Sequence, residues 1–512
     1  MEELRNNAGR ICLSETIYDG QAEQGVELDH VLPDYYPEIF RILSCRLTPR
    51  IMSYGIVGDS KLTLDGNVDI KVLYLAEGSN NIHCIEQRYT YTKTVDIGKA
   101  ATGNNCIKLS SRADYCNCRA VSGRRIDVRG AISTRIYITA ERTVSIPVMP
   151  KDLQVRTCEL TCYGDIRSTE KQFSVREEIE TGASGIGCIM RSYATAKVND
   201  VRIISDKVIV KGAVTVNAAY SIYNEKEQGY NDIERMSADI PVSQIIELQG
   251  VDEDFAHTAE IDILNCELTC NTDNGIIGCN MLAVCRVRCS KEATVDVPID
   301  IYSTQFETEH SSKQIKAVKS TANITKQFNL HAEAYCDDSE INAVWDCNAE
   351  VFNISCNVVE NGIRLNGQIC YQVLCRTNEG IPCYIEKQEG FEQIITADIE
   401  SFNRIRDFSS ECIDADYNIR QNGTLELTAA VEFCCTTSDE EFISITDNVK
   451  IHEDRPKHHD SSYALRIFYA DGSEDSWDIA KRYCTSVDAI LSENEIENTD
   501  EKLNGMIFIP SI

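Results

Sequence analysis

The sequence predicts a mainly β protein, with three tandem all-β repeat units followed by a small α+β module of βααβ order. Two observations lead to this prediction. Apolar and polar residues alternate over many runs rich in β-branched side chains, which is typical of half-buried strands, and one such pattern recurs at a period of about 150 residues. The last fifty residues break this pattern and contain two short helical stretches between two strands.

The composition bounds both the size and the partners of the protein. A chain of 512 residues with 43% hydrophobic residues is long enough for several domains with sizeable cores. Fifty basic residues against eighty-one acidic ones give a formal net charge of −31. A surface this acidic repels phosphate and anionic lipid headgroups, which argues against nucleic acid and membranes as partners.

Neither a secretion signal nor a membrane span is evident in the sequence. The first residues, MEELRNNAGRICLSETIYDG, contain no apolar h-region. No uninterrupted apolar run approaches the roughly 20 residues that a membrane helix requires. We therefore expect the chain to be made, and at first kept, in a cytosol.

The repeat is clearest around three glycines, Gly66, Gly212 and Gly367. They lie in SKLTLDGNVDIKVLYL (60–75), DKVIVKGAVTVNAAYS (206–221) and NGIRLNGQICYQVLCR (361–376), each read as two alternating runs around the glycine. Eight residues later stand Tyr74, Tyr220 and Cys375. A glycine inside a strand pattern marks a bulge or a tight contact between sheets, or it allows a ligand to approach closely; the bulge or the contact between sheets is favoured.

The register continues on both sides of the glycines. Cys45, Ser192 and Cys347 precede them by 20 or 21 residues, and a further strand pair follows in each unit, at 122–138, 274–289 and 422–435. These landmarks predict the following organisation: an N-terminal tail (1–25), unit 1 (26–150), unit 2 (151–311), a divergent unit 3 (312–451), a linker (452–462) and a C-terminal module (463–512).

Twenty-four cysteines are many for a cytosolic chain. No C-x-x-C motif occurs, and strand residues four apart are separated by about 13 Å, too far to share one zinc ion. We predict reduced thiols that fill strand positions, with neither metal nor cofactor, and leave open cross-linking in a later oxidising setting. The linker histidines, His452, His458 and His459, are interpreted as parts of a solvated hinge rather than as metal ligands.

The C-terminal module shows strand, helix, helix and strand in turn. YALRIFYA (463–470) alternates as a strand, SWDIAKRY (476–483) places Trp477 on an inward stripe, and LNGMIFIP (503–510) closes the module with Gly505 as a turn. Ser473 is a candidate N-cap of the first helix. Thr485 with Asp488 forms a candidate capping box for the second.

Residues 463–510 resemble a LysM domain, through WDIAKRY, TSVDAIL and LNGMIFIP. LysM domains usually carry a Gly-Asp-Thr-Leu turn before the tryptophan, and here Ser473-Glu474-Asp475-Ser476 stands in its place. The resemblance implies a scaffold whose glycan-reading edge has lost its glycine and gained carboxylates. Trp477 is expected in the module core.

The repeats resemble the SPOCS domain of clostridial spore-coat assembly proteins. The resemblance rests on LDHVLPDYYPEIFRILSCRLTPRIM (28–52), DIPVSQIIELQGVDE (239–253) and VDVPIDIYSTQFE (295–307). Unit 3 lacks the Leu-Pro lead-in. Tandem SPOCS units with one C-terminal LysM domain is the layout of clostridial spore-coat morphogenetic proteins, which bind the ATPase of the coat basement layer.

Three functions compete. The first is a non-enzymatic spore-coat adaptor in the mother-cell cytoplasm at the forespore surface, which grips the coat ATPase through the LysM domain and holds coat proteins, or itself, through the repeats. The second is a glycan-binding LysM protein tethered to peptidoglycan of the cell wall or spore cortex. An enzyme is disfavoured, because no nucleophile elbow, H-E-x-x-H motif or phosphate-binding glycine loop occurs and no catalytic residue stands out.

The partner-binding residues are predicted in the two loops that border the LysM groove. They are acidic or polar and suit basic side chains on a protein partner better than a neutral sugar. The predicted residues are Asp471, Glu474, Asp475, Ser476, Asn494, Glu495 and Glu497.

Overall fold

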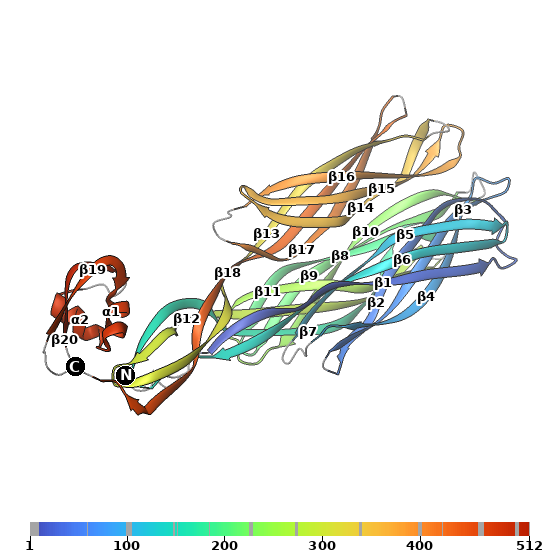
Figure 1. The fold of residues 1–512 in the computed structure, drawn as a ribbon. Helices are drawn as coiled ribbons and strands as arrows, with labels where there is room; N and C mark the ends of the chain where they lie inside the picture. The colour runs from blue at the N-terminus through green and yellow to red at the C-terminus, as the bar shows by residue number, and fades with distance from the viewer. Residues whose placement is uncertain are drawn as a thin grey trace.

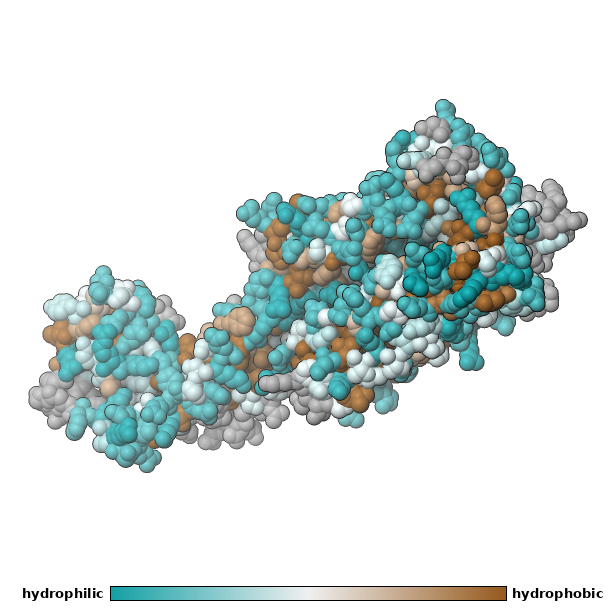
Figure 2. All heavy atoms as spheres, turned by 45° about the vertical axis from the view of Figure 1, so that its right-hand side comes forward, coloured by the Kyte–Doolittle hydropathy of each residue, from teal (hydrophilic) through white to brown (hydrophobic). Residues whose placement is uncertain are grey.

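The computed structural model of the chain confirms a mainly β architecture. It describes residues 10–58, 60–98, 105–146, 149–150, 152–183, 185–224, 229–271, 275–336, 340–397, 402–421, 423–458, 465–496 and 501–510. Figure 1 shows long, twisted strands running along an elongated body, and a small helical module at one end. Figure 2 shows the same outline, with the module beyond a narrower neck.

Each of the three units consists of six strands. Unit 1 contains β1 (Arg10–Val31), β2 (Ile39–Val57), β3 (Lys61–Ala76), β4 (Ile82–Asp96), β5 (Asn105–Ser122) and β6 (Arg125–Ser145). Unit 2 contains β7 (Leu153–Glu180), β8 (Ile186–Ile204), β9 (Lys207–Asn224), β10 (Gly229–Glu247), β11 (Ala256–Asn271) and β12 (Ile276–Ser303). Unit 3 contains β13 (Phe306–Ala334), β14 (Ile341–Val359), β15 (Gly362–Thr377), β16 (Pro382–Thr396), β17 (Arg404–Ile419) and β18 (Leu425–Pro456).

The strand order is the same in all three units. One antiparallel sheet joins the first, sixth and fifth strands, as in β1-β6-β5, and the other joins the second, third and fourth, as in β2-β3-β4. The first strand therefore pairs with the last one of its own unit, so that each unit is closed by its two ends.

Two predicted boundary segments are strands. The predicted N-terminal tail contains most of β1, which pairs with β6 from Arg10 onward. The predicted linker begins inside β18, where His452 pairs with Glu307 and Pro456 with Phe306. The prediction of a tail and a linker was wrong at both places, because these polar stretches show no apolar alternation and their strand pairing is set by distant partners.

One continuous strand passes through each repeat glycine, so the predicted break into two runs was wrong. Gly66, Gly212 and Gly367 lie within β3, β9 and β15, the central strands of their sheets. Opposite each glycine the neighbouring second strand is bulged, with register shifts between Ile51 and Ser53, Val198 and Asp200, and Phe352 and Ser355. The expected bulge is present, but on the adjacent strand, and the expected contact between sheets is not what Gly66 and Gly367 show, since their close neighbours Tyr91 and Phe391 belong to the same sheets.

Neighbouring groups occupy the space where a side chain of each glycine would lie. A Cβ atom on Gly66 would come 2.5 Å from the Tyr91 ring, and one on Gly367 would come 2.7 Å from the Phe391 ring. Both aromatic residues are the direct cross-strand partners of these glycines. In unit 2 a Cβ on Gly212 would lie 2.4 Å from the backbone oxygen of Lys197. Close packing by neighbouring groups therefore favours glycine at each of the three positions.

The upstream landmarks are structurally equivalent. Cys45 pairs with Val72, Ser192 with Ala218 and Cys347 with Val373. Each partner stands six residues after its glycine, so the predicted repeat register holds in three dimensions. Cys375 occupies the position of Tyr74 and Tyr220 and is fully buried like them.

The three units share apolar clusters in addition to their own cores. One cluster takes residues from the first strand of every unit, from the last strands of units 2 and 3, and from Ile146 just beyond β6: Ile11, Ile146, Leu160, Cys162, Val297, Ile315, Ala317, Ile443 and Ile445. A second cluster combines buried Leu73, Met190 and Leu374 with partly buried Leu43 and Trp345. Burying apolar area between units is the main force that holds them in one body.

Ion pairs also join the units. The Nζ atom of Lys108 in unit 1 lies 2.8 Å from Glu260 of unit 2 and 3.1 Å from Asp407 of unit 3. Burial opposes the charge on Lys108, but the two carboxylates outweigh this effect and raise its pKa. Arg191 of unit 2 makes two hydrogen bonds of 2.7 Å to Asp346 of unit 3.

The C-terminal module follows as β19 (Leu465–Asp475), α1 (Ser476–Tyr483), α2 (Val487–Asn494) and β20 (Lys502–Pro510). Its strands form a two-stranded antiparallel sheet. The predicted βααβ order is confirmed. Gly505 lies within β20 with a φ of +93°, not in a turn between elements as predicted.

Candidate functional site

The first helix of the module begins with a capping box built on Asp475. The Asp475 side chain accepts a hydrogen bond of 3.0 Å from the Asp478 amide, and the Asp475 amide donates one of 3.3 Å to the Asp478 side chain. This arrangement satisfies helix-end donors that would otherwise be unpaired. The N-cap is therefore Asp475 and not Ser473, and Ser486, not Thr485, caps α2.

Trp477 belongs to the core of the module, as predicted. It is 6% exposed and packs with Ile479, Ala480 and Ile490, which are fully buried. The core also includes Tyr302 from the last strand of unit 2. The module is thus packed onto the body of the protein.

Asp300 of β12 is the main polar contact between unit 2 and the module. It accepts a hydrogen bond of 2.8 Å from the Trp477 indole and contacts the Lys481 ammonium group at 2.7 Å. Burial raises the pKa of Asp300, but the hydrogen bonds from Lys481 and Trp477 outweigh this effect, and the net pKa is lowered. Asp300 is therefore held as a carboxylate at the base of α1.

Tyr302 and Arg156 extend this contact. The Tyr302 ring meets the Trp477 ring edge-on, with centroids 5.0 Å apart, and its hydroxyl donates a 2.8 Å hydrogen bond to the Thr485 carbonyl. Arg156 of β7 lies 3.3 Å from the Asp475 carboxylate. We call these residues, with Asp300, Trp477 and Lys481, the docking contact.

The seven predicted partner-binding residues differ in their exposure to solvent. Asp471 and Glu495 are exposed, and Glu474 is partly exposed in an ion pair with Arg482. Asp475 and Ser476 are buried, at 3% and 0% exposure. Glu497 lies outside the described residues.

Asn494 has a structural role within the module. Its side-chain amide donates hydrogen bonds to the carbonyls of Ile490 and Phe508, and its oxygen accepts one from the Phe508 amide. These bonds fasten the end of α2 to β20. Burial of Asp475 and Ser476 and the internal bonds of Asn494 leave Asp471, Glu474 and Glu495 as the described loop residues that a partner could reach.

The loop before α1 retains a glycine in a left-handed backbone conformation, contrary to the sequence-based expectation. Gly472 has a φ of +88°, a conformation that side chains rarely adopt, and a Cβ placed there would meet nothing within 4 Å. The glycine has moved to the position before Ser473. The loop geometry therefore does not by itself argue against a glycan.

The outer face of the module's sheet exposes large apolar side chains, which the sequence analysis missed. Leu465, Ile467 and Tyr469 of β19 are 38%, 53% and 73% exposed, and Met506 of β20 is 48% exposed. Tyr469 pairs with Met506, and Ile467 with the partly exposed Phe508. We call these five residues the outer face. Their signal in the sequence is that LRIFYA has large apolar residues at both alternating sets of positions: Leu465, Ile467 and Tyr469 face outward, while Phe468 and Ala470 pack in the core.

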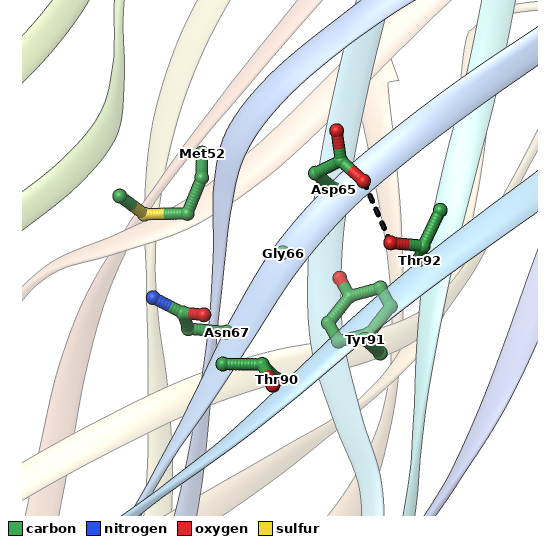
Figure 3. A pocket seen from close by; sticks show the side chains of 7 residues that line it. All are labelled: Met52, Asp65, Gly66, Asn67, Thr90, Tyr91 and Thr92. Carbon is green, nitrogen blue, oxygen red and sulfur yellow. Dashed lines mark hydrogen bonds between the residues drawn. The ribbon is translucent and has the colours of Figure 1, made fainter.

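The body also carries a shallow depression beside Gly66. Figure 3 shows Tyr91 beside Gly66, with Asp65 bonded to Thr92 and Met52 on the far side. The Thr92 hydroxyl donates a 2.7 Å hydrogen bond to Asp65. Because the Tyr91 ring fills the space above the glycine, this depression is a by-product of sheet packing and makes a poor ligand site.

The described part of the chain shows neither a metal-binding cluster nor a membrane-spanning helix. There, no group of three or more His, Cys, Asp or Glu side chains is placed to hold a metal ion. None of the described helices is long and apolar enough to cross a membrane.

Comparison with known proteins gives one family match. The family model described as "SipL, SPOCS domain" matches residues 38–121 and 186–271. These ranges cover β2–β5 of unit 1 and β8–β11 of unit 2, the same four strands in each unit. No curated protein and no solved structure matches the chain. The chain therefore has two regions similar to the SPOCS domain, and this similarity suggests a sporulation-related protein.

Proposed function

We propose that this chain, with its two SPOCS regions, is a non-enzymatic adaptor of spore-coat assembly. Its C-terminal module, of LysM type, docks on the ATPase of the coat basement layer. The three β units recruit or organise other coat proteins. The protein acts in the mother-cell cytoplasm, at the forespore surface.

The observation that carries this proposal is the outer face of the module. Four large apolar side chains stand 38–73% exposed on one side of a two-stranded sheet, while the other side is covered by the helices. A contiguous apolar patch of this kind on a small domain marks a protein interaction surface. Tyr469, exposed and amphipathic, is the residue type that most often dominates such interfaces.

Charge supports a protein partner over a wall polymer. Residues 461–512 contain ten acidic and four basic residues, a net charge of −6. Bacterial wall polymers are often anionic and would be repelled. The exposed Asp471 and Glu495 instead suit basic side chains on a protein.

The docking contact supports the adaptor role of the whole chain. It attaches the module to unit 2 through Asp300 and Tyr302, so that the outer face is presented at the end of an elongated body. An adaptor that joins two protein layers needs such a fixed separation between its binding surfaces.

The test compares capture of the coat ATPase by full-length variants. Ile467→Ser with Tyr469→Ser removes apolar area without touching the module core. Loss of one interface hot spot costs at least about 2 kcal/mol, so we expect capture to weaken roughly 30-fold or more. The matched control is Phe442→Ser, which removes a 70% exposed side chain from β18.

Two results would contradict the proposal. One is unchanged ATPase capture by the Ile467→Ser, Tyr469→Ser variant. The other is strong sedimentation of the wild-type chain with insoluble peptidoglycan in the absence of ATPase capture, which would favour glycan binding.

A further inference from the structure

In units 1 and 3, thiols from opposite sides of the same unit lie in direct contact. In unit 1, the Sγ atoms of Cys45 on β2 and Cys116 on β5 are 3.3 Å apart. In unit 3, the Sγ atoms of Cys336, just beyond β13, and Cys383 on β16 are 3.2 Å apart. In each pair the two cysteines come from different sheets.

We propose that Cys45–Cys116 and Cys336–Cys383 are oxidative modification sites, at which a small-molecule disulfide converts each thiol pair into an intrachain disulfide. The sulfur atoms need to approach by little more than 1 Å to reach the bond length of about 2.05 Å. Movements of this size are within the reach of side-chain rotation. The inference does not depend on the proposed adaptor function.

The reaction is thiol–disulfide exchange in two steps. The thiolate of one cysteine attacks a sulfur of the small disulfide, forms a mixed disulfide and releases one small thiolate. The second cysteine, as a thiolate, then attacks the protein sulfur of the mixed disulfide and displaces the other small thiolate. Two protein thiols are oxidised, one small disulfide is reduced to two thiols, and the two protons pass to these products.

Access and thiolate formation favour Cys116 as the attacking residue in unit 1. Cys45 and Cys116 are both only partly buried. Hydrogen bonding with Cys45 outweighs burial and lowers the pKa of the Cys116 thiol. In unit 3, Cys336 is partly exposed while Cys383 is buried, so Cys336 meets the oxidant first.

A more deeply buried pair serves as an internal comparison. Cys266 and Cys279 of unit 2 have Sγ atoms 4.0 Å apart, and both are buried in the core. They are farther apart and closed to a dissolved oxidant. Unit 2 also has Ser192 at the position of Cys45 and therefore lacks the cross-sheet pair.

The two disulfides are expected to raise the thermal stability of units 1 and 3. Each disulfide would tie the two sheets of its unit together and close a chain segment of 71 residues (45 to 116) or 47 residues (336 to 383). Cross-links over segments of this length restrict the unfolded chain strongly. We expect oxidation to raise the thermal midpoints of units 1 and 3 by roughly 5 °C or more.

The experiment treats folded, reduced full-length protein with oxidised glutathione, blocks the remaining thiols by alkylation and maps linked peptides by mass spectrometry. The expected products are the 45–116 and 336–383 links, formed before any 266–279 link. Exposed Cys158 reports that the oxidant is active, through its mixed disulfide.

Serine variants distinguish loss of one specific disulfide from misfolding of the protein. Cys45→Ser is expected to fold, because serine occupies the equivalent position in unit 2, and to lose only the 45–116 link and the stabilisation of unit 1. Cys336→Ser should do the same for unit 3. The proposal is overturned if Cys116 and Cys336 end as mixed disulfides with glutathione, or if the 266–279 link forms first.

Discussion

Asp300 is the residue on which attachment of the module depends most directly. It binds both Trp477 and Lys481, so Asp300→Ala leaves an indole N–H and an ammonium group without their shared acceptor. We expect the module to detach while remaining folded, and trypsin to cut faster after Lys457. The rate of release of a fragment of about 50 residues measures this effect. Asp296→Ala, an exposed aspartate on the same strand, is the control and should leave the rate unchanged.

The same contact should depend on pH in a defined direction. The pKa of Asp300 is lowered in the folded protein, so its contribution to docking is complete above the ordinary aspartate pKa of about 3.9 and is lost as the pH falls through the lower folded value. The Nε2 atom of His310 lies 3.7 Å from the same carboxylate. Detachment at pH 5–6 would contradict this account.

The exposed loop carboxylates should affect how fast the proposed partner binds and how strongly binding depends on salt. Asp471→Lys with Glu495→Lys should slow association with the coat ATPase and reduce the salt dependence of binding, because charges at the rim of an interface act mainly on the association rate. Surface binding kinetics at several salt concentrations measure it. Glu77→Lys with Glu253→Lys, two exposed positions on the body, is the charge-matched control. Equal effects of both variants would mean that net charge alone matters.

At the level of elements, alanine substitutions of the strand glycines should lower stability by different amounts. Gly212→Ala should lower unit 2 stability by about 1–3 kcal/mol, because the new methyl group meets the Lys197 backbone oxygen at 2.4 Å. Gly66→Ala should cost less, since the side chain of Tyr91 can turn away. Gly25→Ala in β1 meets nothing within 4 Å and is the control. Shifts of the thermal midpoint measure the order, and a larger effect for Gly25 would refute it.

The same elements show how far the sequence could predict the fold. The alternation of apolar residues and the spacing of the glycines identified the units. Burial of every second strand residue requires apolar side chains at alternate positions, and close packing favours glycine at one position in each repeat. The extents of β1 and β18 were missed, since their pairing depends on a distant strand and not on their own pattern. The capping residue of α1 was misplaced by two positions, since Ser473 and Asp475 are equally suitable N-caps and only the surrounding contacts decide between them.

The candidate site was harder to predict than the fold. The acidic character of the loops was visible in the sequence, but the burial of Asp475 by Arg156 of unit 2 depends on a contact across more than 300 residues. The outer face was overlooked for the opposite reason. Apolar residues in a strand are ordinarily assigned to the core, and here only one of the two faces is covered.

At the level of the whole molecule, the shared apolar cluster should couple the three units. Ile445→Ala removes a fully buried side chain from this cluster and should cost about 2–5 kcal/mol. Hydrogen exchange should then increase in β1 and β7 as well as in β18. Leu427→Ala, in a core that belongs to unit 3 alone, should increase exchange in unit 3 only. Identical exchange patterns for the two variants would show that the units are not coupled through this cluster.

The closure of each unit by its own first and last strands has a consequence for synthesis on the ribosome. Val31 ends β1 and Arg125 begins β6, so the two partners are 94 positions apart in the sequence. The first and last strands of the other two units are separated by a similar length of chain. At about 5–20 residues per second, a nascent β1 remains unpaired for roughly 5–20 s. During that time it offers a long open edge to neighbouring chains on the same message. The half-made units, not the finished protein, are therefore where a holding chaperone would be needed.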